Sequence, residues 1–558
     1  MKTPHWNPTV YYETFTDFLQ GISAFGDSPA ICYADENGQM RSHSYRTLCA
    51  DVAVLRRALN AHSLAEKRVA IVGENSYEWL VLFFAVVSSG GVAICVDIEQ
   101  NDNTIRSMIK QADAQVVFAS PSLLPICMPM LGQNADIQCV FSLTAPESDT
   151  SVGGTFGALY REGIEIKETE PPALTPEQPA VLIFTSGTTA EPKGVVLTHR
   201  NLLQNAGAAV ATVDLGQSIF VGLPFFHAYG LNCGVICSLL KGARLTINGN
   251  LATMLRDLAL SESETVIAVP LMVEALYNSV WAQIRRAGRE EEVNRLLKRF
   301  LMFRKFKLTV GQREREQIRD QYFGHLRLIV CGGAHMNTDI SRQLEALGVL
   351  VLQGYGITEC SPLISVNRNL SWNLESVGIL LPGYEMKLVD GEILVRGPSV
   401  MGGYYKDPEA TAAVLQDGWF RTGDLGSRNA RGHLFITGRT KNLIVLKNGK
   451  KISPEKLEEM VLTIPMVKDA LVYGVVSGGD ADDVQPAVNI YPDPKLTEHM
   501  EDYEVLGALQ HEIDRLNSTL PAYQQLQVVN LREREFTKTS SMKIKRYAAE
   551  NRNDLAVK

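Results

Sequence analysis

The sequence lacks the features that mark several common classes of protein. Its 9 cysteines are scattered, odd in number and without a Cys-x-x-Cys pair, which is typical of reduced, mostly buried thiols in an intracellular protein. A net charge of −8 lacks the positive excess that general nucleic-acid binding needs. Residues 1–7 carry no apolar run, so no signal peptide is predicted. Repeats and low-complexity tracts are also absent. We expect a cytoplasmic protein with no nucleic-acid partner.

One stretch imitates a membrane-spanning helix. Residues 79–96 contain no charged side chain and are just long enough to cross a bilayer. Serine and glycine at 88–91 interrupt this stretch, and the residues after them are β-rich. A helix, a turn and a strand are therefore the preferred interpretation, and a transmembrane helix is the alternative.

The composition is that of a globular protein with several domains. The chain has 558 residues, 45% of them apolar and 21% charged, and it is too long for one ordinary core. Strand patterns at 69–73, 92–96 and 116–119 alternate with helical patterns. The clearest helix is predicted at 77–88, where Ser76 can cap its first turn. This alternation predicts an α/β region with largely parallel sheets.

The segment at residues 181–202 contains a cluster of candidate ligand-binding residues. Apolar residues 181–184 precede a loop of small residues, most of them hydroxylated, and a lysine: Thr185, Ser186, Gly187, Thr188, Thr189 and Lys193. Such a loop exposes backbone N–H groups, and the hydroxyls and the lysine complete a cradle for a polyphosphate. The Gly-Lys-Ser/Thr order of the common P-loop is missing. A polar surface hairpin is the alternative.

These residues resemble the phosphate-binding loop of the adenylate-forming superfamily, which includes acyl-CoA synthetases, peptide-synthetase adenylation domains and luciferases. The pattern is Thr-Ser-Gly-Thr-Thr-Gly-x-Pro-Lys-Gly, and Ala190 stands here where glycine is usual. The resemblance implies ATP as a substrate and an α/β fold. It also implies a large N-terminal domain of stacked mixed sheets with helices, residues 1–439, and a small mobile α+β domain, residues 440–558.

Residues 223–230 match the Leu-Pro-x-x-His-x-x-Gly of acyl-CoA synthetases. Taken alone, His227 among aromatic residues is more typical of a packed structural histidine. The resemblance implies instead that His227 lines the carboxylate pocket and serves catalysis. Amino-acid-activating relatives carry an aspartate here, and none stands in this stretch. The implied substrate is therefore a carboxylic acid without an α-amino group.

Two glycine-containing segments resemble the parts of the superfamily that surround adenine and phosphate. In residues 328–335 and 351–362 a strand runs into a glycine turn, and the second segment matches Tyr-Gly-x-Thr-Glu. A plain turn is the alternative for either segment. The resemblance implies that six residues of these segments bind ATP: Gly333, Ala334, Gly354, Tyr355, Gly356 and Thr358. Glu359 is the implied catalytic carboxylate and, with Thr188, the implied ligand of Mg²⁺, which prefers oxygen atoms.

Two further motifs match the ribose site and the domain junction of the superfamily. Asp424, in Thr-Gly-Asp, is implied to accept the ribose hydroxyls, and Arg439 to contact ribose or phosphate. Lys441 falls at the hinge position, which is Asp or Lys in the family. The loop at 447–455 resembles the one that faces the thiol acceptor after the small domain has rotated.

Residues 536–546 resemble the family's Pro-x-Thr-x-x-Gly-Lys-x-x-Arg. Lys543 occupies the position of the adenylation lysine and is the implied catalytic residue of the small domain. Met542 and Thr537 replace the family's glycine and proline. A lysine-rich tail is the alternative.

Residues 281–327 form an insertion-like helical region in which basic and apolar residues are interleaved. One interpretation is a solvated amphipathic helix that packs on its own domain. The other is peripheral contact with an anionic membrane. A helical stretch of this length before residues 331–334 resembles long-chain acyl-CoA synthetases more than acetyl-CoA synthetases.

Together these features predict an AMP-forming acid–thiol ligase. It would activate a medium- or long-chain fatty acid with ATP and Mg²⁺ and transfer the acyl group from acyl-AMP to the co-substrate CoA. Two alternatives stay open. One is an acyl-AMP ligase that loads an acyl carrier protein. The other is an inactive sensor that binds nucleotide or acyl chains; Ala190 and Met542 favour it, whereas the retained lysines and carboxylates oppose it.

Overall fold

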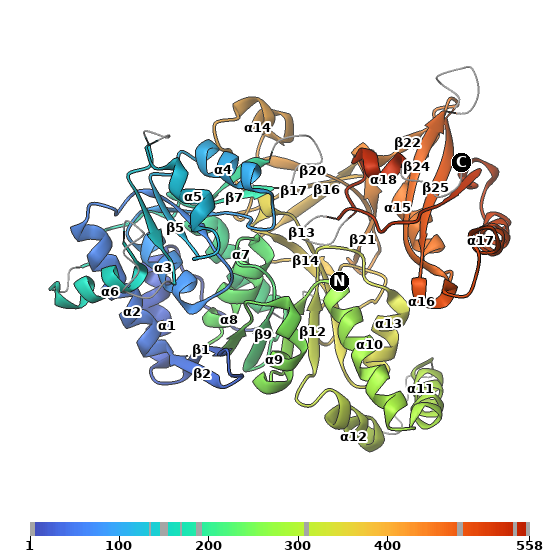
Figure 1. The fold of residues 1–558 in the computed structure, drawn as a ribbon, viewed down its shortest axis with the longest axis horizontal. Helices are drawn as coiled ribbons and strands as arrows, with labels where there is room; N and C mark the ends of the chain where they lie inside the picture. The colour runs from blue at the N-terminus through green and yellow to red at the C-terminus, as the bar shows by residue number, and fades with distance from the viewer. Residues whose placement is uncertain are drawn as a thin grey trace.

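The computed structural model describes residues 6–132, 136–144, 154–167, 170–185, 192–305, 312–476, 484–538 and 544–553. A large body holds the blue, green and yellow parts of the chain, and a smaller orange-to-red body lies at its side (Figure 1). The large body is built on two long sheets and a third, smaller one. The prediction of an α/β fold with stacked mixed sheets and a small C-terminal α+β part is confirmed.

The seven-stranded sheet carries the phosphate-loop segment. Its order is β18 (Gly403–Tyr404), β8 (Lys193–Thr198), β7 (Pro179–Thr185), β4 (Val92–Cys95), β3 (Arg68–Val72), β5 (Val116–Ala119) and β6 (Cys139–Ser142). The strands from β7 to β6 are parallel, whereas β8 runs antiparallel between β7 and β18. The predicted strand–loop–strand segment is therefore a hairpin at one side of a parallel sheet.

The charge-free stretch at 79–96 is a buried helix followed by a strand. Helix α3 (Tyr77–Ser88) has the predicted bounds, and the Ser76 hydroxyl accepts a hydrogen bond from the Trp79 N–H as its N-cap. Strand β4 follows it. Across the described ranges, no helix is both long and apolar enough to span a membrane.

The nine-stranded sheet carries the two glycine turns. Its order is β15 (Ile379–Leu380), β14 (Leu363–Val366), β13 (Leu350–Gly356), β12 (Leu328–Cys331), β11 (Thr265–Ala268), β9 (Ser218–Val221), β10 (Arg244–Ile247), β1 (Pro29–Ala34) and β2 (Met40–Ser44). Helix α7 (His199–Thr212) is buried over almost its whole length and contacts β8 of the seven-stranded sheet and β14 of this one. It therefore links the two sheets.

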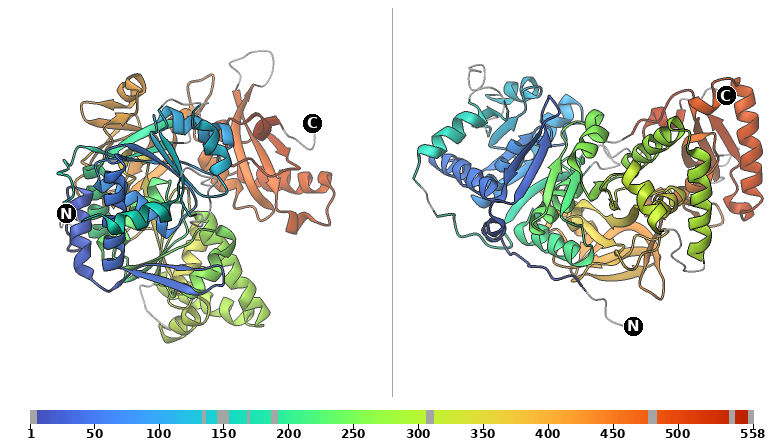
Figure 2. Two further views of the ribbon diagram at one scale, coloured as in Figure 1. Left: turned by 60° about the vertical axis from the view of Figure 1, so that its left-hand side comes forward. Right: turned by 90° about the horizontal axis from the view of Figure 1, so that it is seen from below.

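Helices surround the sheets of the large body (Figure 2). Besides α3 and α7 they are α1 (Phe15–Ile22), α2 (Tyr45–Ala61), α4 (Asp102–Gln111), α5 (Leu124–Cys127), α6 (Phe156–Glu165), α8 (Cys237–Leu240), α9 (Met254–Ser261), α10 (Pro270–Arg286), α11 (Glu290–Lys305), α12 (Gln312–Tyr322), α13 (Thr338–Ala346) and α14 (Pro408–Val414). A π-helix, η3 (Tyr229–Ile236), runs directly into α8. Short 3₁₀ turns are η1 (Ser23–Phe25), η2 (Met128–Met130), η4 (Leu251–Thr253) and η5 (Thr358–Cys360).

The insertion-like region contains the end of α10 and helices α11 and α12. Val293, Leu297 and Phe300 of α11 are buried and belong to the core of the large body. This burial agrees with the interpretation of an amphipathic helix packed on its own domain. The side chains of residues 303–311, among which several basic residues were noted in the sequence, lie outside the described part of the structure.

The third sheet leads into the small body. It consists of β16 (Glu385–Val389), β17 (Glu392–Arg396), β19 (Leu415–Gln416), β20 (Trp419–Arg428) and β21 (Leu434–Arg439). The small body follows with η6 (Thr440–Asn442), β22 (Ile444–Val445), β23 (Lys451–Ile452), α15 (Pro454–Val461), β24 (Val467–Val476), β25 (Val484–Pro492), α16 (Pro494–Thr497), α17 (Asp502–Asn517), η7 (Ala522–Gln524), β26 (Val528–Leu531) and α18 (Ala549–Asn553). Its buried residues, from Ile444 to Leu531, form a core of their own.

Candidate active site

A buried carboxylate lies where the nine-stranded sheet meets the third sheet. Asp424 of β20 is 2% exposed. Its two oxygens are held from different elements: the Tyr355 hydroxyl of β13 donates to Oδ2 at 2.7 Å, and Nε of Arg439 in β21 lies 2.8 Å from Oδ1. Burial, and then the charge of Asp424, hold the pKa of Tyr355 well above its ordinary value. Tyr355 and Arg439, two of the predicted ATP-binding residues, therefore both contact the third, Asp424.

A second polar group connects the phosphate-loop strand with the Thr-Glu motif. Lys193, in β8, places its ammonium group 5.2 Å from the centre of the Tyr404 ring. The Tyr404 hydroxyl donates a 2.8 Å hydrogen bond to Oε1 of Glu359 in η5. Tyr404 reaches this place because β18 pairs with β8. Lys193 and Glu359, which are far apart in the chain, therefore both contact Tyr404.

Glu359 fits a Mg²⁺ ion that is shared with a nucleotide. Its carboxylate is half-buried and accepts a hydrogen bond from Tyr404, which leaves further lone pairs for a ligand. Among the described residues there is no group of three or more His, Cys, Asp or Glu side chains that could hold a metal ion by itself. One carboxylate together with phosphate oxygens and water is an arrangement that Mg²⁺ commonly takes.

The turn after β13 requires glycine at position 356. A Cβ atom on Gly356 would lie 2.1 Å from the carbonyl oxygen of Pro362, a backbone atom that cannot move aside. Gly333, in the other glycine turn, has φ of +88°, a value that L side chains rarely adopt. Without a Cβ atom at these two positions, the backbone of each turn can adopt its tight conformation and approach its neighbours closely.

An apolar cavity of about 80 Å³ lies beside these glycine turns. Gly333, Gly354 and Gly356 are among the residues that line it. The remaining wall comes from α7, η3 and the strands beside them, and includes Ala209, Val213, Cys233, Ile267, Val330 and Leu363. The cavity is thus lined both by the predicted nucleotide-site glycines and by apolar core residues of the large body.

His227 lies in the loop before η3. Its ring packs against Phe226 with 4.7 Å between the ring centres, and its side chain is half-buried. Asn75 fixes this loop, because its side-chain amide donates to the Leu223 carbonyl at 2.8 Å and accepts from the Phe225 N–H at 2.9 Å. His227 is not among the residues that line the apolar cavity. Its role in the carboxylate pocket remains a prediction.

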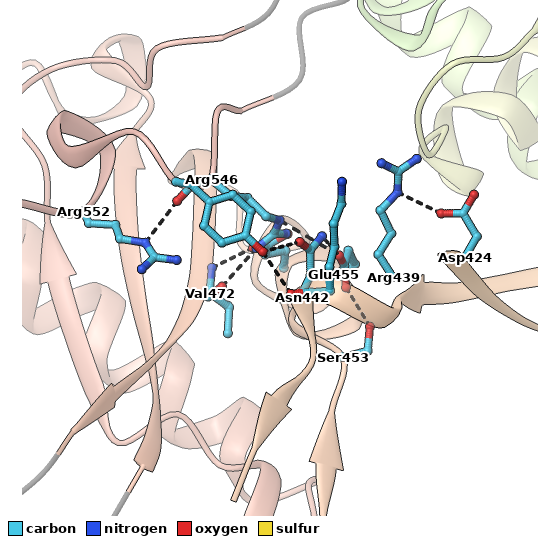
Figure 3. Close-up of polar contacts among 11 residues, drawn as sticks. Asp424, Arg439, Asn442, Ser453, Glu455, Val472, Arg546 and Arg552 are labelled. Atoms are coloured by element: carbon cyan, nitrogen blue, oxygen red, sulfur yellow. Dashed lines mark hydrogen bonds and ion pairs between the residues drawn. The ribbon is translucent and has the colours of Figure 1, made fainter. Parts of the chain in front are cut away.

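Polar contacts lie on both sides of the predicted hinge (Figure 3). Glu455 of α15 accepts a 2.6 Å hydrogen bond from the Asn442 amide. The Tyr547 hydroxyl bonds Asn442 Oδ1 at 2.9 Å and the carbonyl of Lys441 at 3.0 Å. Partial burial of its ammonium group, and then the charge of Arg439, lower the pKa of Lys441. The predicted hinge therefore lies between the Asp424–Arg439 pair and the first helix of the small body.

Part of the predicted site lies outside the described residues. This applies to Ser186, Gly187, Thr188, Thr189 and Lys543. The residues beside them are described: Thr185 and Lys193 are paired across the β7–β8 hairpin, and Arg546 forms an ion pair with Glu458 of α15. Thr358 is half-buried in η5 and Ala334 is exposed after β12.

Sequence reasoning missed two parts of this site. Tyr404 belongs to none of the motifs, and only its position three residues before the acidic start of α14 draws attention to it. The cavity lining on α7 and η3 reads as ordinary core sequence, because alanine, valine and cysteine are common in any interior. No local pattern distinguishes a wall residue from a packed one.

Comparison with known proteins agrees with this architecture. Residues 19–405 match the family model described as AMP-binding enzyme, and residues 441–557 match that of the AMP-binding enzyme C-terminal domain. Both bodies of the chain therefore match one class of enzyme, the AMP-binding enzymes. The chain belongs to the AMP-binding enzyme family.

Individual relatives show which members of the family this chain is similar to. A long-chain-fatty-acid–CoA ligase of Mycobacterium bovis is 28% identical over 466 residues, which cover 76% of this chain and 75% of the relative. The enzyme of the same name from Escherichia coli O157:H7 is 25% identical over 536 residues, 88% of each chain. The crystal structure of an anthranilate CoA ligase with anthranoyl-AMP shares the fold, with a TM-score of 0.78 and 20% identity over 97% of this chain and 96% of that one. The predicted class, an enzyme related to acid–CoA ligases, is confirmed.

Proposed function

We propose that this chain activates a medium- or long-chain fatty acid with ATP and transfers the acyl group to CoA, forming acyl-CoA, AMP and pyrophosphate. The observation that carries the proposal is the apolar cavity lined in part by Gly333, Gly354 and Gly356, the last two of which flank Tyr355, the partner of Asp424. An acyl chain in this cavity would have its carboxylate at the glycine turns. Long-chain-fatty-acid–CoA ligases among the relatives support this substrate class.

In the proposed first step a carboxylate oxygen of the acid attacks the α-phosphorus of ATP. The bond from that phosphorus to the bridging oxygen breaks, and pyrophosphate leaves with acyl-AMP as the other product. Asp424 and Arg439 would bind the ribose, and Tyr355 and Gly356 would flank the base. The loop at 185–193 would hold the β- and γ-phosphates, with Lys193 as its fixed charge. Positioning and electrostatics supply the rate, because no protein nucleophile is needed.

Mg²⁺, bound by Glu359 and phosphate oxygens with Thr188 as a further ligand, would supply positive charge against the phosphates. Lys543, from its place in the last motif, is proposed to neutralise the charge that grows on the α-phosphate. His227 is proposed to line the carboxylate pocket.

In the proposed second step the thiol of CoA attacks the acyl-AMP carbonyl, the thioester forms and AMP leaves. We propose that domain 440–558 turns against domain 1–439 about Lys441 between the steps. This motion would withdraw Lys543 and present the 447–455 loop. The small body has a hydrophobic core of its own, which suits motion as a unit.

The experiment is pyrophosphate release from ATP over acids from acetate to oleate, with and without CoA. Release that CoA stimulates, with a maximum at long chains, supports the proposal. Release without a CoA thioester favours a carrier-protein acceptor, since the same thiol chemistry serves both. No release with any acid contradicts the enzyme proposal for these substrates and favours the nucleotide- or acyl-binding sensor.

A further inference from the structure

Three buried side chains converge on the backbone that follows Glu359. Asn205 of α7 donates to the carbonyls of Leu363 at 2.7 Å and Cys360 at 3.2 Å. Its Oδ1 accepts the Leu363 N–H at 3.3 Å. The Tyr384 hydroxyl donates to the Cys360 carbonyl at 2.9 Å. All four hydrogen bonds act on residues 360–363, the segment directly after the predicted metal ligand.

Asn232 of η3 completes this group. Its amide nitrogen donates to the Ser361 carbonyl and, at 3.1 Å, to Oδ1 of Asn205. Asn205, Asn232 and Tyr384 are all buried, so water does not compete for these bonds. We call these three residues the clamp. An unpaired carbonyl in such an interior is unfavourable, which gives the clamp a strong hold on the local backbone.

The same helix fixes a second loop that contacts Glu359. Asn201, one turn before Asn205, donates to the carbonyls of Pro398 at 2.7 Å and Val400 at 3.1 Å. The next residue along, Met401, donates its N–H to the carbonyl of Glu359 at 2.8 Å. Glu359 is therefore tied at its backbone to a loop fixed by α7, and at its side chain to Tyr404.

The clamp also borders the acyl cavity. Cys233 lines the cavity and is the neighbour of Asn232 in the π-helix. Pro362 and Leu363 also line the cavity and belong to the clamped segment. Inserted π-helical turns are common at functional sites. The cavity wall and the carboxylate are therefore parts of one hydrogen-bonded unit.

We propose that Asn205, Asn232 and Tyr384 are positioning residues that set the place of Glu359. The inference rests on the proposed function, in which Glu359 acts on the polyphosphate of ATP. The clamp does not touch the reactants. It acts by fixing the peptide groups from Cys360 to Leu363.

The first test uses Tyr384→Phe, which removes one hydroxyl and keeps the ring. Tyr45→Phe is the matched control, because the buried Tyr45 hydroxyl also donates to a backbone carbonyl, that of Ala243 at 2.8 Å, away from Glu359. We expect Tyr384→Phe to lower kcat for pyrophosphate release by about tenfold and to raise the Mg²⁺ concentration for half-maximal rate. The control is expected to change neither. Equal behaviour of the two variants would overturn the proposal.

The second test uses Asn205→Ser. Asn517→Ser is its control, since Asn517 binds both the carbonyl and the N–H of Leu526 at 2.9 Å, the same pattern as Asn205 with Leu363, in the small body. Hydrogen exchange of the peptide covering 357–366 is measured in both. Faster exchange only in Asn205→Ser supports the clamp, and unchanged exchange contradicts it.

The exchange measurement needs no turnover, so it separates the two proposals. If the unaltered chain releases no pyrophosphate with any acid, the proposed function fails, while the exchange of residues 357–366 still decides the clamp. If the unaltered chain is active and Tyr384→Phe and Asn205→Ser match their controls, the clamp alone fails. Tyr384→Phe keeps the core volume, so it also provides a folded variant if Asn205→Ser does not fold.

Discussion

The Tyr355 hydroxyl donates a 2.7 Å hydrogen bond to the buried carboxylate of Asp424, 69 residues further along the chain. Tyr355 is the penultimate residue of β13 in the nine-stranded sheet, and Asp424 lies in β20 of the third sheet. The bond therefore joins two sheets at the place where the nucleotide is expected. It leaves part of the carboxylate for a ligand, because each carboxylate oxygen can accept more than one hydrogen bond.

Replacing the carboxylate should weaken nucleotide binding. Asp424→Asn is expected to raise KM for ATP about 10- to 100-fold, because hydrogen bonds to a charged group contribute roughly 1.5–3 kcal/mol each. Asp257→Asn is the control: this buried carboxylate accepts hydrogen bonds from Asn248 and Thr253, each at 2.7 Å, and neither partner is a predicted ATP-binding residue. Steady-state kinetics of pyrophosphate release measure both. An unchanged KM in Asp424→Asn would remove this residue from the ribose site.

The contact of Lys193 with Tyr404 predicts unequal effects at the two positions. Lys193→Met should lower kcat/KM for ATP about 10²- to 10³-fold, since it removes a charge directed at the phosphates. Tyr404→Phe should lower it only about 2- to 10-fold, because the ring stays over the lysine and a single hydrogen bond to Glu359 is lost. Lys406→Met serves as control, since Lys406 is exposed and pairs with Asp113. Comparable losses in Lys193→Met and Lys406→Met would contradict a phosphate role.

Filling the apolar cavity should shorten the acids that are accepted. Ala209→Phe places a ring among the cavity residues of α7. If the ring excludes about four methylene groups of the acyl chain from the cavity, about 3 kcal/mol of binding free energy is lost. This loss lowers kcat/KM for a long acid about 100-fold. Short acids should be unaffected. Ala287→Phe, on the exposed end of α10, is the matched control. The measurement is kcat/KM over a chain-length series, and an unchanged optimum would place the acyl chain elsewhere.

The buried His199 predicts a loss of stability in acid. Its Nδ1 accepts the N–H of Phe15 at 3.2 Å, and burial lowers its pKa to about 4. Between about pH 6.5 and 4 the unfolded chain binds a proton that the folded chain does not. The stabilisation is therefore complete above about 6.5 and decreases as the pH falls, by about 3 kcal/mol at pH 4.

Calorimetric unfolding of the large body from pH 7.5 to 4 tests this expectation. His199→Asn keeps an acceptor for the Phe15 N–H and removes the titrating ring. Its unfolding temperature should depend less steeply on pH than that of the unaltered chain. Identical pH dependence in the two proteins would show that other groups dominate.

Several parts of the structure could be predicted because their signals are local. The helix at Tyr77–Ser88 has the predicted bounds, since an N-capping serine precedes it and Ser88 and Ser89 close an apolar run. The hairpin at β7 and β8 follows from two apolar runs around a polar loop. The family and the enzyme class likewise follow from motifs whose order and spacing are retained.

Other parts could not be predicted because they depend on which distant segments meet. Tyr404 reaches Glu359 only through the pairing of β18 with β8. Asn205 looks like any polar residue of a helix, and its burial follows from the position of α7 between two sheets. The roles of all the predicted site residues, His227, Lys441 and Lys543 among them, stay predictions.

The sequence by itself determined the order of the chemistry-bearing motifs, the alternating α/β pattern and the glycines that allow tight turns. Each is a property of a few neighbouring residues, set by backbone sterics and side-chain type. Only the tertiary structure decided which residues face one another: Tyr355 with Asp424, Lys193 with Tyr404, and the walls of the cavity. The physical reason is that the pairing of strands and the burial of helices bring together side chains whose separation along the chain carries no local signal.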